Sequence, residues 1–208
     1  MTGPQITSKS FSIIRNRLGS FTAPSEVMEI VIRIAHTTGD VDFATTFDLE
    51  QEAVAAGVQA LKNGAPVITD VEMVRTGVRK PLLHDLGGQD YCFLNDPEVV
   101  EKVKGSDTTR SALAMEKAGE ILNGAVVAIG NAPTALFKLM EMTDASIVKP
   151  ALIIGVPVGF VGALESKEEL ATKNYNHITN LSERGGSTIA AAIVNGLLAL
   201  ASDRAGRS

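Results

Sequence analysis

The second half of the chain alternates between continuous apolar runs and segments with helical spacing. The runs predict buried strands at 125–129 and 150–156, and a shorter strand is predicted at 177–181. A helix is predicted after each run, over 132–142, from Ser166 onward and over 187–201. Ser166 and Glu169 have the spacing of a capping box, which favours a helix start at Ser166.

The first half of the chain is less regular but follows the same alternation. Val27, Ile30 and Ile34 lie at helical spacing and Gly39 closes the segment, which predicts a helix over 25–38. The remaining predicted elements are a helix over 50–62, strands at 66–68 and 91–94, and a helix over 109–122.

Continuous apolar strands that alternate with helices predict an α/β fold. We expect a mostly parallel sheet with helices on both faces, a Rossmann-like three-layer architecture. The 208 residues suit a single domain, residues 1–208. Ligands of such sheets bind beyond the carboxyl ends of the strands, so a site is expected near the loops after Ile129, Val156 and Leu181.

Composition narrows the function classes. The formal net charge of −5, with no Trp and two Tyr, argues against nucleic-acid binding. No apolar run reaches the roughly 20 residues of a membrane span, and residues 1–10 lack an apolar signal core, so a cytoplasmic protein is expected. Cys92 is the only cysteine, and three scattered histidines make a metal site unexpected.

A polar stripe runs along the helix predicted at 25–38. Glu26, Glu29, Arg33 and His36 share one face by their spacing of three and four residues. The spacing alone favours a solvated face, with Glu29 and Arg33 as an ordinary ion pair. The alternative is that Arg33 and His36 project into a cleft, where a histidine exchanges protons near neutral pH.

Three glycine-rich loops and one arginine suggest an anionic ligand. The turn 130–135 joins a strand to a helix and would aim free N–H groups at an anion, or else is only a tight turn. It lacks the Walker and dinucleotide patterns. Further glycine-rich loops lie at 155–162 and 184–187. Arg110 at a helix start opposes the helix dipole, which modestly favours an anionic partner for it.

Several longer motifs occur in order along nearly the whole chain. They are 10–15 (SFSIIR), 33–39 (RIAHTTG), 64–74 (GAPVITDVEMV), 109–112 (TRSA), 130–136 (GNAPTAL), 155–167 (GVPVGFVGALESK) and 184–187 (RGGS). In this set the chain resembles precorrin-8X methylmutase, also called cobalt-precorrin-8 methylmutase.

The resemblance implies an isomerase that shifts a methyl group from ring carbon 11 to ring carbon 12 of a corrinoid. The product would be hydrogenobyrinate or cobyrinate, an intermediate of cobalamin biosynthesis. It also implies a homodimer with shared active sites and no separate cofactor.

The resemblance further assigns roles to residues. His36 matches the proton donor and acceptor, and Ser10 and Arg33 match substrate-binding positions. Arg110 matches an arginine near the substrate carboxylates, acting in its own subunit or across the dimer. We also expect the loop positions Asn131, Thr134, Gly159 and Gly186 to bind substrate.

Some alternatives stay open. The chain could be a non-catalytic carrier of corrinoids, or, less favoured, a nucleotide-binding module. Asp40 either orients the His36 imidazole or caps a loop, and its turn preference favours the loop. The sequence does not distinguish a cobalt-containing from a cobalt-free substrate, and it leaves open the protonation state of His36 and the loops that close on the substrate.

Overall fold

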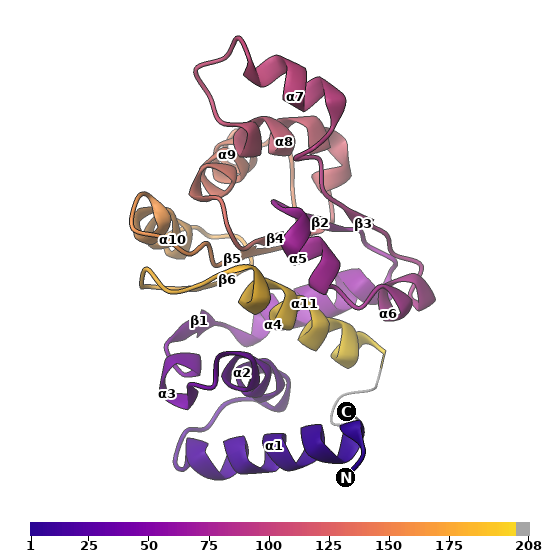
Figure 1. The fold of residues 1–208 in the computed structure, drawn as a ribbon, viewed down its shortest axis with the longest axis vertical. Helices are drawn as coiled ribbons and strands as arrows, with labels where there is room; N and C mark the ends of the chain where they lie inside the picture. The colour runs from indigo at the N-terminus through magenta and orange to yellow at the C-terminus, as the bar shows by residue number, and fades with distance from the viewer. Residues whose placement is uncertain (203–208) are drawn as a thin grey trace.

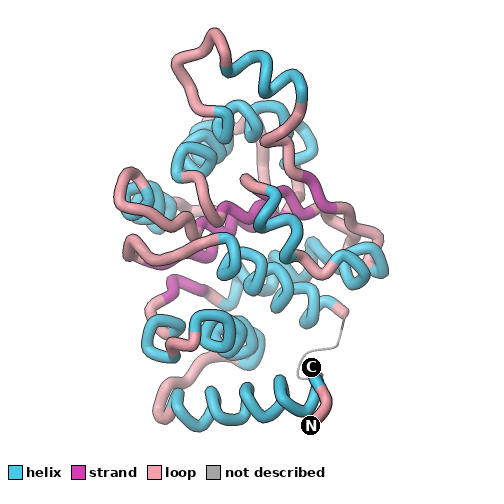
Figure 2. The backbone as a smooth tube through the Cα atoms, viewed as in Figure 1, coloured by secondary structure: helices cyan, strands magenta, loops and turns pink. Residues whose placement is uncertain are grey.

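A six-stranded sheet lies at the centre of the computed structural model, which describes residues 1–202. The strand order is β1-β6-β5-β4-β2-β3, and every neighbouring pair is parallel except β1 with β6. Figure 2 shows the strands as a band between helices. The strands are β1 (Phe47–Leu49), β2 (Val67–Thr69), β3 (Asp90–Tyr91), β4 (Val126–Ile129), β5 (Leu152–Gly155) and β6 (His177–Asn180).

The central strands are apolar on both faces because helices cover both faces. Successive side chains of a strand point to opposite sides, so Val126 and Ala128 join one core cluster while Val127 and Ile129 join the other. All four are fully buried. The predicted α/β class with a mostly parallel sheet and helices on both faces is confirmed.

Each face of the sheet has its own helices (Figure 1). Helix α11 crosses one face and contacts α4 and α5 there, and α8 packs on α9 over the other face. On the α11 side lie α4 (Gln51–Lys62), α5 (Glu72–Gly77), α6 (Lys80–Asp85) and α11 (Ser187–Ala201). On the α8 side lie α7 (Pro97–Val103), α8 (Arg110–Ala118), the 3-10 turn η1 (Gly119–Leu122), α9 (Pro133–Asp144) and α10 (Ala163–Ala171).

A further layer of helices lies outside α11. Helix α2 (Ser25–Thr38) packs on α11, α1 (Gly3–Leu18) packs on α2, and α3 (Val41–Ala44) follows α2. The apolar residues Phe11, Ile14 and Leu18 form the buried face of α1. Gly39 ends α2 in the left-handed conformation at φ 69°, as its position in the sequence predicted.

Several predicted element ends were wrong. Helix α10 begins at Ala163, not at Ser166, and its N-cap is Gly162, whose φ of 75° suits glycine. Ser166 therefore lies inside the helix and donates to the Ala163 carbonyl at 2.9 Å, so the capping box does not form. The strand predicted at 91–94 is limited to Asp90–Tyr91, and the helix predicted to 122 ends at Ala118 and continues as η1.

Candidate active site

His36 lies near the carboxyl end of α2, beside α1. Its Nδ1 is 2.9 Å from the Ser10 hydroxyl, a hydrogen-bond distance, and its ring meets the Phe11 ring edge-on with centroids 5.4 Å apart. Within residues 1–202, no hydrogen-bond partner contacts Nε2. The Ser10 contact thus holds the imidazole by one nitrogen and leaves the other available to a ligand.

Arg33 is buried one turn before His36. Its side chain donates to Glu29 at 2.8 Å, both side chains are less than 10% exposed, and Arg15 lies 3.6 Å from the same carboxylate. The guanidinium carbon lies 5.4 Å from the centre of the Phe11 ring, and Nε is buried without a partner. The interpretation of Glu29 and Arg33 as a solvated ion pair is therefore wrong, since both side chains are buried, whereas His36 on the same stripe is exposed.

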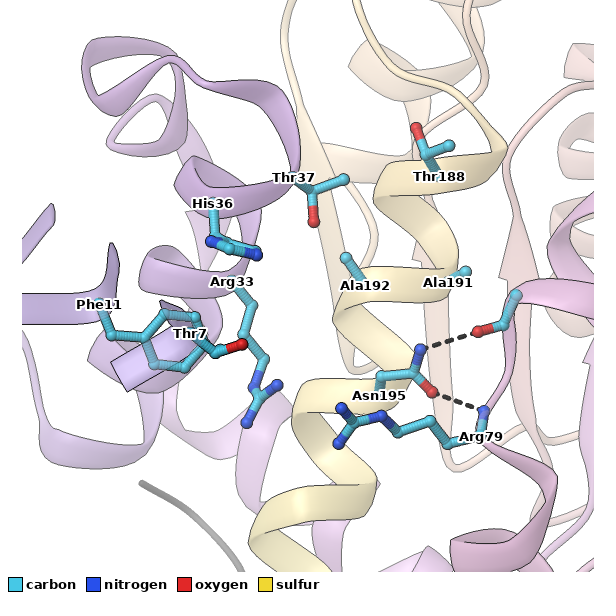
Figure 3. Close-up of a pocket in the computed structure, with 11 residues that line it drawn as sticks. Thr7, Phe11, Arg33, His36, Thr37, Arg79, Thr188, Ala191, Ala192 and Asn195 are labelled. Atoms are coloured by element: carbon cyan, nitrogen blue, oxygen red, sulfur yellow. Dashed lines mark hydrogen bonds between the residues drawn. The ribbon is translucent and has the colours of Figure 1, made fainter. Parts of the chain in front are cut away.

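A cavity of about 330 Å³ opens between α2 and α11 (Figure 3). Arg33 and His36 border it on the α2 side, and Asn195 borders it on the α11 side. Its lining contains no Asp or Glu. The lining residues are Thr7, Phe11, Arg33, His36, Thr37, Gly77, Arg79, Thr188, Ala191, Ala192 and Asn195.

A second cavity of about 330 Å³ also includes His36. It lies along α1, where Ile6 and Ile13 give it an apolar wall and Lys9 and Arg17 supply positive charge. Ser10 lines this cavity as well. The imidazole therefore forms part of the walls of two neighbouring cavities.

The predicted site residues fall into separate groups. Ser10, Arg33 and His36 come together at these cavities. Arg110 is the first residue of α8, and Thr134 lies in the first turn of α9, where its hydroxyl is 2.7 Å from that of Thr109. Neither cavity is lined by Arg110, Asn131, Thr134, Gly159 or Gly186.

The turn after β4 does not offer free N–H groups. The Asp70 carboxylate accepts hydrogen bonds from the backbone N–H groups of Gly130, Asn131 and Ala132 at 3.1, 2.8 and 2.8 Å. Burial raises the pKa of Asp70, while the three donors act in the opposite direction. The N–H groups that one interpretation of this turn offered to an anion are thus bound by a side chain of the protein, which removes the main support for a nucleotide-binding module.

Asp40 caps the start of α3, a helix rather than the loop that was favoured. Its side-chain bonds go to Phe43 and Arg184 and not to His36. Its carboxylate accepts from the Phe43 N–H at 2.8 Å and pairs with Arg184 at 2.9 Å. The Phe43 N–H and then Arg184 hold the pKa of Asp40 below its ordinary value. Arg184 also lies 3.7 Å from the centre of the Phe43 ring, so it anchors the loop 181–186 to α3.

Comparison with known proteins identifies the family. A profile of the precorrin-8X methylmutase family matches residues 5–200. The chain is 40% identical to a cobalt-precorrin-8 methylmutase from Leptospira interrogans, with 99% of this chain and 97% of the relative covered. It is 43% identical to a precorrin-8X methylmutase from Pseudomonas aeruginosa, with 94% of each chain covered. The fold matches a crystal structure of precorrin-8X methylmutase from Thermus thermophilus with a TM-score of 0.90, at 35% identity and 97% coverage of both chains.

This chain belongs to the precorrin-8X methylmutase family. Membership of that family makes it an isomerase of cobalamin biosynthesis, and the resemblance seen in the motifs is confirmed. The relatives carry the names of enzymes, so the comparisons favour the isomerase over a carrier. Both the cobalt-containing and the cobalt-free names occur among methylmutases similar to this chain.

Four residues that the structure brings forward were not singled out from the sequence. Arg79 and Asn195 line the first cavity, and Asp70 and Lys167 hold backbone at the strand ends. Asp70 and Lys167 lie inside the family motifs, and that position in the sequence could have pointed to them. Asn195 could have been found less easily, as the only amide side chain in an otherwise apolar helix.

Residues 1–202 contain neither a candidate metal-ligand cluster nor a candidate membrane-spanning helix. In the described part of the chain, no group of three or more His, Cys, Asp or Glu side chains is placed to hold a metal ion. Across the same residues, no helix has the length and apolar content needed to cross a membrane.

Proposed function

We propose that this methylmutase moves the methyl group of precorrin-8X or cobalt-precorrin-8 from ring carbon 11 to ring carbon 12, giving hydrogenobyrinate or cobyrinate. The observation that carries the proposal is His36, held by Ser10 at Nδ1 and open at Nε2, with Arg33 in the same cavity. We further propose that the enzyme works in the cytoplasm without nucleic acid or membrane partners.

The methyl shift requires the protein to bind the substrate and to exchange a proton with it. The shift breaks one carbon–methyl bond and forms another in the same molecule, so atoms balance without a methyl donor. Adding a proton to a ring nitrogen or neighbouring ring carbon, and removing it later, selects the tautomer that rearranges. A positioned imidazole suits this task because it gives and takes protons near neutral pH.

Binding a polyanionic ring requires cations and a large surface. Arg33 is fixed by Glu29 and Phe11, so its guanidinium is already oriented for a carboxylate. The cavity of about 330 Å³ is at the small end of the range for ligand sites, about 300–1,000 Å³. We therefore propose that the cavity encloses only part of the corrinoid.

A second copy of the chain would complete the site. Arg110 lies on α8, across the sheet from α2 and His36 (Figure 1). The loops after β5 and β6 carry Phe160, Val161 and Leu181, which are 93%, 89% and 56% exposed. Large exposed apolar side chains in adjoining loops mark an interaction surface. We propose that the enzyme is a homodimer in which Arg110 reaches the partner's site, with Asn131, Thr134, Gly159 and Gly186 nearby.

The test is turnover by the purified protein. Wild type is expected to convert the substrate unaided, seen as a change of the corrinoid absorption spectrum, with cobalt-containing and cobalt-free substrate assayed in parallel. His36→Ala is expected to bind corrinoid but to lose about 10²–10⁴-fold in kcat, the usual contribution of acid–base catalysis.

The matched control is His84→Ala, which removes an exposed histidine of α6 that lines neither cavity. Full activity of His36→Ala would exclude the proton-exchange role. Tight binding of corrinoid by wild type, with no product from either substrate, would favour the carrier instead.

A further inference from the structure

Arg79 is a cation without a partner in the first cavity. Among residues 1–202 its guanidinium forms no hydrogen bond or ion pair, and its side chain is exposed. Its neighbours differ, because Arg75 and Lys80 both pair with Asp90, at 2.7 and 3.0 Å. Arg79 therefore adds a positive charge to the cavity that no described carboxylate compensates.

The backbone at Arg79 is fixed from α11. Asn195 accepts a hydrogen bond from the Arg79 N–H at 2.8 Å and donates to the Gly77 carbonyl at 2.8 Å. Asparagine is a poor residue for a helix interior, and Asn195 lies among apolar residues of α11, so these two bonds account for its presence. A Cβ at position 77 would come 2.7 Å from the Ala191 Cβ, so this segment approaches α11 closely.

Arg79 and Arg33 enter the cavity from opposite walls. Arg33 comes from α2, and Arg79 comes from the connection between α5 and α6, extending past Asn195 toward the side of the cavity where Arg33 lies (Figure 3). Arg33 is balanced by Glu29, whereas Arg79 is not. With no Asp or Glu in the lining, the cavity has a net positive charge and suits a carboxylate.

We propose that Arg79 binds a carboxylate arm of the corrinoid at the wall facing Arg33, and that Asn195 is the residue that positions Arg79. The assignment rests on the proposed function, and adds to it a second carboxylate subsite within one chain. An acetate or propionate arm presents the planar carboxylate that a guanidinium binds through two parallel hydrogen bonds. Two such contacts would fix the rotation of the ring relative to His36.

The test compares Arg79→Gln, Arg79→Lys and the control Lys80→Gln. Lys80→Gln removes the same charge one residue away, where it is paired with Asp90 and does not line the cavity. Arg79→Gln is expected to raise KM for the substrate and Kd for the product about 10- to 100-fold, as for a lost charged hydrogen bond, with kcat within about threefold. Arg79→Lys should recover only part of the lost affinity, because lysine keeps the charge but cannot form two parallel hydrogen bonds with a carboxylate.

The role of Asn195 is tested by combining changes. Asn195→Ala should raise KM when it is made in the wild-type protein. When it is made in the Arg79→Gln variant, it should change KM by less than about twofold, because both substitutions remove the same contact with the substrate. Equal effects in the two backgrounds would overturn the positioning role. Melting temperatures check that each variant is folded.

The outcomes separate this inference from the proposed function. Turnover by wild type, with KM and Kd of Arg79→Gln no different from those of Lys80→Gln, would overturn the Arg79 subsite alone. Absence of product from wild type would overturn the proposed function itself.

Discussion

At the scale of single residues, Lys167 is an unusual buried cation. Its side chain is fully buried, and Nζ donates to the backbone carbonyls of Ser182 and Arg184, at 2.8 Å for Arg184. Asn180 donates to the same Arg184 carbonyl at 2.9 Å. These donors hold the loop 181–186 that leads into α11, and so place Thr188 at the first cavity.

Because Lys167 is buried, we expect the free energy of unfolding to depend on pH. Burial lowers its pKa from 10.5 to about 8 in the folded protein. Between these values the unfolded chain binds more protons than the folded one, so the free energy of unfolding rises with pH in this window. Between pH 8 and 10.5 we expect the free energy of unfolding of wild type to rise by on the order of 1–3 kcal/mol relative to that of Lys167→Met.

Urea unfolding at several pH values measures the effect. Taking the difference from Lys167→Met cancels other groups, including Cys92, whose pKa burial raises. A difference that stays flat from pH 8 to 10.5 would mean that Lys167 keeps its proton in the fold.

Residues of the site differ in how far the sequence predicted them. The spacing placed Arg33 and His36 on one face of a helix, and the resemblance carried by the motifs indicated that this face belongs to a substrate site. The sequence could not show that Glu29 and Arg33 are buried, because α1 and α11, the helices that cover α2, are separate segments of the chain. Arg79 and Asn195 are 116 positions apart, and only the folded chain brings them together.

At the scale of elements, the Asp70 carboxylate joins β2 to the turn between β4 and α9. Three consecutive N–H groups at a helix start need acceptors, and Asp70 supplies them from the neighbouring strand. Of the two interpretations left open for this turn, the one with N–H groups free for an anion was therefore wrong. Long apolar strands and helices were predictable, whereas a side chain that caps a distant turn leaves no periodic signal.

Removing one acceptor oxygen of Asp70 should weaken this junction. In Asp70→Asn, one carboxylate oxygen becomes an NH₂ group that faces N–H donors in a buried site. We expect a loss of about 1–3 kcal/mol in the free energy of unfolding, the cost of leaving buried donors unpaired.

Chemical denaturation measures the loss, with Asp107→Asn, the same change at an exposed position, as the control. That control should stay within about 0.5 kcal/mol of wild type. Equal stability of the two variants would show that Asp70 does not hold the turn.

At the scale of the whole molecule, the order of the layers separates residues that the resemblance assigns to one site. His36 lies on α2, outside the helices of one face, and Arg110 begins α8 on the other face. The class of sheet was predictable from alternating strands and helices. The extra layer of α1, α2 and α3 was not, because spacing within one helix does not show which other helix covers it.

Mixing two inactive variants decides whether Arg110 acts across a dimer. If it does, a dimer of one His36→Ala chain and one Arg110→Ala chain has one site with both changes and one intact site. Random exchange of subunits should then restore about a quarter of wild-type activity, since half of the dimers are mixed and each has one working site. If Arg110 acts in its own subunit, every site contains one changed residue and the mixture stays as inactive as its components.

Sedimentation of wild type as a monomer would contradict the dimer directly. The double variant Phe160→Ser with Val161→Ser should favour the monomer if these exposed side chains form the interface.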